Sequence, residues 1–254
     1  MHQRIAMYLA TALVTLTVMV ALTTVAPRIK AADSVPCRQD AMIVFDSSGS
    51  MSGMIITGVR QSRIDRVREA LNEVLPQIER DRNIGLIIYG PGNSTGDTAS
   101  CRNIDTRFGP IPNAASRIIA DVGALEPWGE TPLTSAVEMA ADVLSQRVSE
   151  GVIVLFTDGQ ETCGGQTCAL ARRLRNQGNN ITVHVVDYTV QNPYGNQSNF
   201  KSHCLANETG GVYVPAQTKS ELVAAFRKTL GCPMLAHNSI ATTPSALRRE
   251  LKKR

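Results

Sequence analysis

Five oxygen-bearing side chains, in three separate segments, have the types and the setting to hold a divalent cation: Asp46, Ser48, Ser50, Thr131 and Asp158. The first three alternate with other residues in one short loop, so their oxygens can point toward one spot. Carboxylate and hydroxyl oxygens are ligands that Mg²⁺ and Ca²⁺ prefer. The chemistry expected from this set is the binding of a hard metal ion.

The segments around these residues indicate how the side chains could come close together in the fold. Asp46 follows the apolar run 41–45 and Asp158 follows 152–157, and both runs have the length and β-branched content of buried strands. If these strands are parallel neighbours, their carboxyl ends share one edge of a sheet. Two carboxylates about 4 Å apart would repel by roughly 4 kcal/mol at an effective dielectric constant of about 20, and a divalent cation reverses that repulsion. The alternative for 46–50 alone is a turn or a helix cap, where Asp and Ser are common.

The rest of the body alternates strands with helices. Apolar runs predict further strands at 84–89, 181–186 and 212–214, with a short antiparallel edge strand at 103–108. Helical patterns occur at 63–75, 113–124, 132–146, 170–176, 200–207 and 220–230. The alternation predicts an α/β fold, a doubly wound and mostly parallel sheet with helices on both faces.

The five residues, in the segments 46–50, 129–133 and 156–159, resemble the metal-ion-dependent adhesion site of the von Willebrand factor type A (VWA) domain. The resemblance covers roughly residues 40–230, and 158–168 is similar to bacterial exported members of that family. It implies a Rossmann-like sheet of six strands, five parallel and one antiparallel at an edge. It also implies that Ser48, Ser50 and Thr131 touch the ion directly, while Asp46 and Asp158 act through water.

The resemblance implies a non-catalytic, metal-dependent binding module. Its ion, Mg²⁺ with Ca²⁺ or Mn²⁺ as alternatives, would accept an Asp or Glu carboxylate from a protein partner. Two other functions stay open: a structural VWA subunit of an envelope complex whose ion only stabilises the fold, and, less favoured, a metal-dependent phosphohydrolase.

Residue types argue against an enzyme. A strand-end aspartate such as Asp46 can accept a phosphoryl group, but the second aspartate of haloacid-dehalogenase-type phosphatases would fall at Ser48. Met51 stands where Gly-x-Ser-x-Gly needs its serine. His184 lies inside a predicted strand, where a packed residue is more common than a catalytic base. We therefore expect no catalytic residues.

Partner choice would depend on the rim of the site. We expect contributions from Met51, Trp128 and Tyr194, the last in the loop 191–196. The alternative for Trp128 is packing against the following helix, and the alternative for 191–196 is an ordinary polar loop.

The charge of the chain is concentrated at its C-terminus. The formal net charge is +4, and from Ser245 onward five basic residues stand against one acidic residue, so the remaining chain is balanced. A balanced body argues against a nucleic-acid surface, which needs a basic face. We assign 38–232 to the VWA domain and 233–254 to a basic, flexible tail.

The N-terminal segment indicates export. Residues 5–26 carry no charged side chain and follow Arg4. We expect 1–32 to be either a cleaved signal peptide or an uncleaved membrane anchor. In both cases the rest of the chain is exported, either secreted, periplasmic or anchored to the inner membrane.

The cysteines agree with export, because an even number in an exported protein favours disulfides: Cys37, Cys101, Cys163, Cys168, Cys204 and Cys232. The ends of a compact domain often lie close together, so we predict a clasp between Cys37 and Cys232 and leave all three pairings of the other four open. Zinc, with His203 beside Cys204 as an extra ligand, is the competing interpretation, although no Cys-x-x-Cys pair occurs.

Overall fold

The structure is a computed structural model, and it describes residues 39–57, 59–92, 97–147, 150–178, 180–188 and 202–232. The expected leader 1–32, the loop 191–196 and the tail 233–254 lie outside the described residues. Within the described ranges, no helix is both long enough and apolar enough to cross a bilayer.

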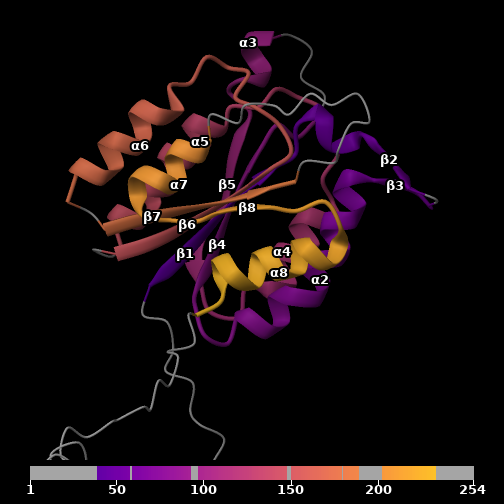
Figure 1. The fold of residues 1–254 in the computed structure, drawn as a ribbon, viewed down its shortest axis with the longest axis horizontal. Helices are drawn as coiled ribbons and strands as arrows, with labels where there is room; N and C mark the ends of the chain where they lie inside the picture. Colours follow the sequence, from indigo (N-terminus) through magenta and orange to yellow (C-terminus); the bar gives the residue numbers. More distant parts are fainter. Residues whose placement is uncertain are drawn as a thin grey trace, which may run out of the picture. The chain divides into compact units, whose positions relative to one another are not determined.

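A sheet of six strands forms the centre: β1 (Asp40–Asp46), β4 (Ile84–Tyr89), β5 (Ile104–Ile111), β6 (Glu150–Thr157), β7 (Asn180–Asp187) and β8 (Tyr213–Pro215). The strand order is β5-β4-β1-β6-β7-β8 (Figure 1). Neighbouring strands are parallel except β4 and β5, which pair antiparallel at one edge. The predicted mostly parallel sheet with one antiparallel edge strand is confirmed.

Helices cover both faces of this sheet (Figure 1). One face carries α2 (Arg63–Ile78), α4 (Ala115–Gly123) and α8 (Lys219–Leu230), and the other carries α5 (Leu133–Ser145), α6 (Thr167–Asn176) and α7 (His203–Thr209). All six were expected from the sequence, with ends that differ by a few residues. Helix α2 begins where it was expected but ends at Ile78 instead of residue 75. The helix is longer because Ile78, on the added turn, is buried in the core.

The two faces hold separate apolar layers. Alternate residues of β1 divide between them: Ile43 and Phe45 belong to one cluster and Met42 and Val44 to the other, as the period of a strand requires. Phe45 stacks on Phe156 of β6, with ring centroids 5.1 Å apart. Packing directly beneath the strand ends therefore fixes the positions from which Asp46 and Asp158 leave the sheet.

A two-stranded hairpin was not predicted from the sequence. It consists of β2 (Met54–Thr57) and β3 (Val59–Ser62), and it follows the 3₁₀ turn η1 (Gly49–Ser52). The backbone N–H of Arg63 donates to the carbonyl of Gly53 at 3.0 Å and closes the base of the hairpin. The strands have four residues each, too few for a clear periodic signal. The short helix α3 (Asp97–Ser100) was missed for the same reason.

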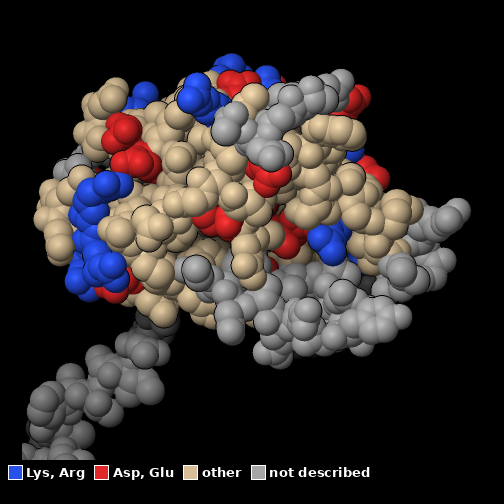
Figure 2. Space-filling view, turned by 90° about the horizontal axis from the view of Figure 1, so that it is seen from above, with Lys and Arg blue, Asp and Glu red and all other residues tan. Residues whose placement is uncertain are grey.

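Charged side chains are mixed on the face seen in Figure 2. Acidic and basic atoms are interspersed there, and no continuous basic surface runs across the part of that face that is described.

Candidate metal centre

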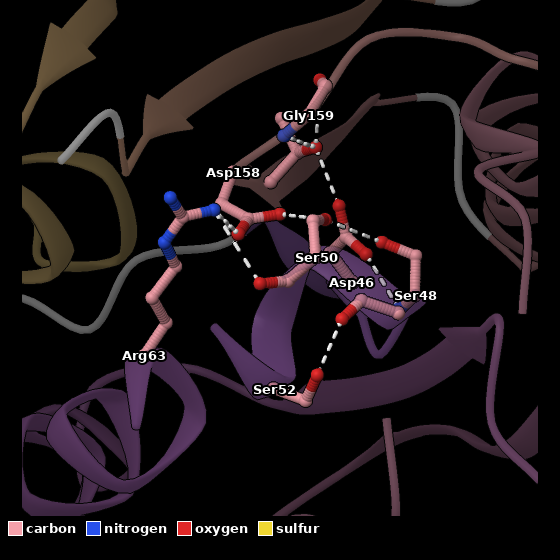
Figure 3. Close-up of polar contacts among 9 residues, drawn as sticks. Asp46, Ser48, Ser50, Ser52, Arg63, Asp158 and Gly159 are labelled. Atoms are coloured by element: carbon pink, nitrogen blue, oxygen red, sulfur yellow. Dashed lines mark hydrogen bonds and ion pairs between the residues drawn. The ribbon is translucent and has the colours of Figure 1, made fainter. Parts of the chain in front are cut away.

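Asp46 ends β1 and is fully buried. Its Oδ1 accepts the backbone N–H of Ser48 at 2.8 Å, and its Oδ2 accepts the hydroxyl of Thr157 at 2.6 Å. The two oxygens are thus held by one donor from the end of β6 and one from the loop between β1 and η1 (Figure 3). A phosphoryl acceptor needs an accessible oxygen, so this burial argues against Asp46 as a nucleophile.

Two serine hydroxyls continue from this carboxylate toward the surface. The Oγ atoms of Ser48 and Ser50 lie 3.0 Å apart. Ser48 is buried and Ser50 is exposed. The hydroxyl of Ser52 points elsewhere, because it donates to the carbonyl of Gly49 at 2.7 Å (Figure 3). Ser48 and Ser50 therefore belong to the polar cluster, whereas Ser52, two residues further on, does not.

Asp158 follows β6 and completes the polar cluster. Its Oδ1 accepts the hydroxyl of Ser50 at 2.5 Å, although 108 residues separate them in the sequence. Its side chain is inaccessible to solvent. Burial in the first place, and then the charge of Asp46, raise the pKa of Asp158 to about 6, while the contacts with Ser50 and Arg63 act in the opposite direction. A divalent cation between the two carboxylates would relieve this repulsion.

Thr131 reaches the same place from the loop before α5. It is buried, its N–H donates to the hydroxyl of Thr162 at 2.8 Å, and its carbonyl accepts the N–H of Thr162 at 3.2 Å. A Cβ on Gly159 would lie 3.5 Å from Ser50 Oγ and 3.8 Å from Thr131 Oγ1. Both hydroxyls therefore face Gly159, and the structure brings the five predicted residues together.

Arg63 is the main polar partner that sequence reasoning missed. Its Nη1 forms an ion pair with Oδ2 of Asp158 at 2.6 Å and lies 3.4 Å from the carbonyl of Ser50 (Figure 3). Arg63 is the first residue of α2, and the unpredicted hairpin delivers it to this position. A sequence signal for the contact is lacking, since 95 residues separate Arg63 from Asp158.

Backbone contacts lock the surrounding loops together. The N–H of Gly49 donates to the carbonyl of Gly129, and the N–H of Gly129 donates to the carbonyl of Gly90, both at 2.9 Å. Gly90 has a φ of +75°, and a Cβ there would lie 2.8 Å from the Cα of Ser48. Only glycine allows the loop after β4 to approach so closely. The ligand loops are consequently held by main-chain contacts that do not depend on an ion.

The donor set suits a hard cation. Two carboxylates and three hydroxyls provide oxygen atoms alone, the ligand type of Mg²⁺ and Ca²⁺. Within the described parts of the chain, no group of three or more His, Cys, Asp or Glu side chains could hold a metal ion. A metal held here would therefore depend on Ser48, Ser50 and Thr131 as well as on the two aspartates.

Two disulfides lie near this edge of the sheet, joining Cys101 to Cys163 and Cys168 to Cys204. The first ties the loop that follows Asp158 to the segment before β5. These two disulfides are one of the three pairings that the sequence left open for the four cysteines. The zinc interpretation is wrong for these cysteines because they are bonded to one another. His203 instead stacks on Tyr213, with ring centroids 3.5 Å apart.

Only one cysteine of the predicted disulfide between Cys37 and Cys232 lies among the described residues. Cys232 is disulfide-bonded, and no described cysteine is free. Cys37 lies outside the described residues, so its pairing with Cys232 stays a prediction.

The rim differs from expectation at one residue. Met51 is completely buried in the core between the sheet and α2, so the prediction that it shapes the rim is wrong. Trp128 is 59% exposed, and its N–H donates to the carbonyl of Ser47 at 3.2 Å. Met54, at the base of the hairpin, is 55% exposed. Tyr194 lies outside the described residues.

Comparisons with known proteins agree with this fold. The family model described as von Willebrand factor type A domain matches residues 41–160. YwmC, an uncharacterized protein of Bacillus subtilis (strain 168), is 29% identical over 189 residues, which are 72% of this chain and 79% of that protein. The crystal structure of the SpRpn10 VWA domain superposes with a TM-score of 0.54 at 14% identity, over 73% of this chain and 93% of that chain.

A further solved structure is proximal thread matrix protein 1 from the mussel byssus, with a zinc-occupied MIDAS motif. It superposes with a TM-score of 0.51 at 16% identity, over 78% of this chain and 46% of that chain. At these identities the two solved structures show likeness of fold.

Proposed function

Because residues 41–160 belong to the von Willebrand factor type A family, we propose that this chain is a non-catalytic protein-binding module that captures an acidic side chain through a divalent ion. The ion would be held by Asp46, Ser48, Ser50, Thr131 and Asp158. The observation that carries the proposal is the convergence of two carboxylates and three hydroxyls on one loop cluster, with Ser50 at the surface.

The formal charges of the site favour an anionic partner. Asp46 and Asp158 contribute two negative charges, and Arg63, paired with Asp158, contributes one positive charge. A dication added to this set leaves a net positive centre. Bound Mg²⁺ would supply a position for an oxygen ligand and complete its shell with water. A partner carboxylate that replaces one such water would make a strong contact because it is ionised.

Exposed apolar side chains near the site would add specificity. Trp128 stands three residues before Thr131, and Met54 stands four residues after Ser50. Exposed aromatic residues often act as anchors in protein interfaces. A single carboxylate contact is too small to define a partner, so this rim would distinguish acidic partners from one another.

We also propose that the domain acts outside the cytoplasm. Two disulfides favour an oxidising compartment, in agreement with the leader proposed at 1–32. The domain would extend from 38 to 232, followed by the tail 233–254. Mg²⁺ is the proposed ion, with Ca²⁺ or Mn²⁺ as alternatives; the zinc-occupied MIDAS motif in the mussel protein is an instance of an ion at such a site in a related fold.

Two serines of the same loop provide a matched test of the ion. Ser50→Ala removes a hydroxyl of the cluster, while Ser52→Ala removes one that points to the Gly49 carbonyl. By titration calorimetry we expect Ser50→Ala to weaken Mg²⁺ binding at least about tenfold and Ser52→Ala to leave it within about twofold. Equal effects of the two substitutions, or no Mg²⁺ binding by the wild-type protein, would contradict the site.

The binding role needs a separate experiment. A partner retained on the immobilised domain with Mg²⁺ should be released by a chelator. It should also be lost when its key Asp or Glu is changed to the corresponding amide. A partner that binds equally well with chelator would show that the ion is structural, which is the alternative function named above.

A further inference from the structure

A second polar site lies at the amino edge of the sheet, the end opposite to the metal centre. A pocket of about 400 Å³ opens there, lined by the last turn of α8 and by Val152 and Thr182 near the starts of β6 and β7. Three cationic side chains line it, those of Arg82, Arg227 and Lys228, and none of the described residues that line it is acidic. The pocket is therefore electrostatically suited to an anion.

Arg82 is the buried cation of this pocket. It is only 7% exposed, and its Nε and Nη1 are buried without a hydrogen-bond acceptor among the residues that the structure describes. Asp40 acts on it electrostatically, but the oxygens of Asp40 accept from Asn83 Nδ2 at 3.0 Å and from Arg147 Nε at 3.4 Å. Buried charged donors are ordinarily paired, so Arg82 indicates a missing acceptor.

His184 provides a neutral donor in the same lining. Its Nδ1 accepts the backbone N–H of Val212 at 3.0 Å, so in the neutral ring the proton is on Nε2. Burial first, and then the charge of Arg82, lower the pKa of His184 to about 4. At neutral pH the ring therefore offers an N–H without adding charge.

A neighbouring pocket differs from this one in the partners of its charged side chains. It has the same volume of about 400 Å³ and shares Gln39 and Thr182 with the first pocket. Its charges are satisfied internally, because Arg175 forms an ion pair with Glu208 and Glu150 lies 3.5 Å from Asn180 Nδ2. Two pockets of equal size at the same edge thus differ in whether their cations already have partners.

We propose that the amino-edge pocket binds a small organic anion through its carboxylate or phosphate group. Arg82 supplies the buried positive charge, His184 Nε2 supplies a neutral donor, and Lys228 supplies a second charge at the exposed end of α8. Arg227 is partly engaged, since its Nη2 donates to Gln77 Oε1 at 3.1 Å. Guanidinium groups suit both kinds of oxyanion, and the volume exceeds what a single inorganic ion needs.

An NMR titration of the full exported domain, freed of metal beforehand with a chelating resin and measured in chelator-free buffer, tests this without involving the metal centre. Inorganic phosphate and citrate are added in separate arms, against sodium chloride of equal ionic strength, and the amide signal of Val212 reports on His184. We expect a saturable shift with phosphate, with citrate or with both, and none with chloride. The arm that saturates at the lower concentration identifies the preferred group.

Three variants decide whether Arg82 carries the binding. Arg82→Gln should raise the Kd at least about tenfold and Lys228→Gln about threefold, whereas Arg175→Gln, in the neighbouring pocket, should leave it unchanged. If Arg82→Gln does not fold, the exposed Lys228→Gln against Arg175→Gln makes the same comparison. A shift that saturates with neither phosphate nor citrate in the wild-type protein, or equal effects of Lys228→Gln and Arg175→Gln, overturns the proposal.

Discussion

The two edges of the sheet differ in how their buried charged groups are paired. At the carboxyl edge, both oxygens of Asp46 and both oxygens of Asp158 accept hydrogen bonds. At the amino edge, two nitrogens of the buried Arg82 have no acceptor among the described residues. The acidic site is therefore prepared by the protein itself, with Arg63 standing beside Asp158. The basic site is left incomplete by the protein. Unpaired buried donors are costly, and Nε of Arg63 is also buried without a partner among the described residues. Nη1 of Arg63, however, is paired with Asp158, whereas no described ion pair involves Arg82. The contrast between the two edges is therefore whether the arginine has a carboxylate partner.

The disulfides near the two edges give the prediction with the largest expected effect on stability. Cys232 lines the amino-edge pocket, and Cys101–Cys163 holds the loop of Asp158 at the other edge. In the chain-entropy model, the long loop closed by Cys37 and Cys232 would stabilise the fold by about 5 kcal/mol, and the loop from Cys101 to Cys163 by about 4 kcal/mol. We expect Cys37→Ser with Cys232→Ser to lower the free energy of unfolding in urea by about that larger amount.

Peptide mapping under non-reducing conditions checks the pairing itself. The expected peptide joins Cys37 to Cys232, alongside those that join Cys101 to Cys163 and Cys168 to Cys204. A peptide joining Cys37 to any other cysteine would falsify the clasp.

The two edges should respond to pH with opposite signs. The pKa of Asp158 is raised to about 6, above its usual value of about 3.9. Its contribution to stability is therefore present below about pH 4 and is lost as the pH rises through about 6. The pKa of His184 is lowered to about 4, below its usual value of about 6.5. Its contribution is present above about pH 6.5 and is lost as the pH falls through about 4.

Single variants separate these two opposing contributions to the free energy of unfolding. Each contribution changes by roughly 3 kcal/mol between the ordinary and the shifted pKa of its group. With EDTA present, urea unfolding of Asp158→Asn should lose the decline between about pH 4 and 6, so its stability rises more steeply with pH than that of the wild type. His184→Asn, whose Oδ1 can still accept from Val212, should lose the opposite slope. Parallel pH profiles of the wild type and both variants would show that neither group titrates as the structure indicates.

Arg63 allows the smallest and most specific test. Its positive charge beside Asp158 should oppose a cation in the metal centre. We expect Arg63→Gln to tighten Mg²⁺ binding about tenfold in titration calorimetry, equal to about 1.4 kcal/mol. Arg173→Gln removes the same charge from an exposed pair with Glu138 and should have no effect. Weaker Mg²⁺ binding in Arg63→Gln would mean that Arg63 positions Asp158 for the ion rather than competing with it.

Much of the fold could be predicted because its signals are local. The apolar runs of β1, β4 and β6 appear as continuous hydrophobic segments, since both faces of a parallel sheet are covered. Helix patterns located α2, α4, α5, α6, α7 and α8 to within a few residues. The hairpin β2–β3 was missed because two four-residue strands carry little periodicity. Met51 was misplaced because nothing in its own loop distinguishes an inward from an outward methionine.

The sequence by itself identified the residues proposed to bind a metal, since Asp46, Ser48 and Ser50 share one loop and Asp158 directly follows an apolar strand. It also determined that the cysteines favour disulfides. Only the tertiary structure decided that Arg63 pairs with Asp158 and that Cys101 pairs with Cys163. It also decided that Nε and Nη1 of the buried Arg82 have no acceptor among the described residues. The physical reason is distance along the chain. Local patterns report which residues share a strand end or a helix face, whereas contacts between segments far apart are fixed only when the whole core packs.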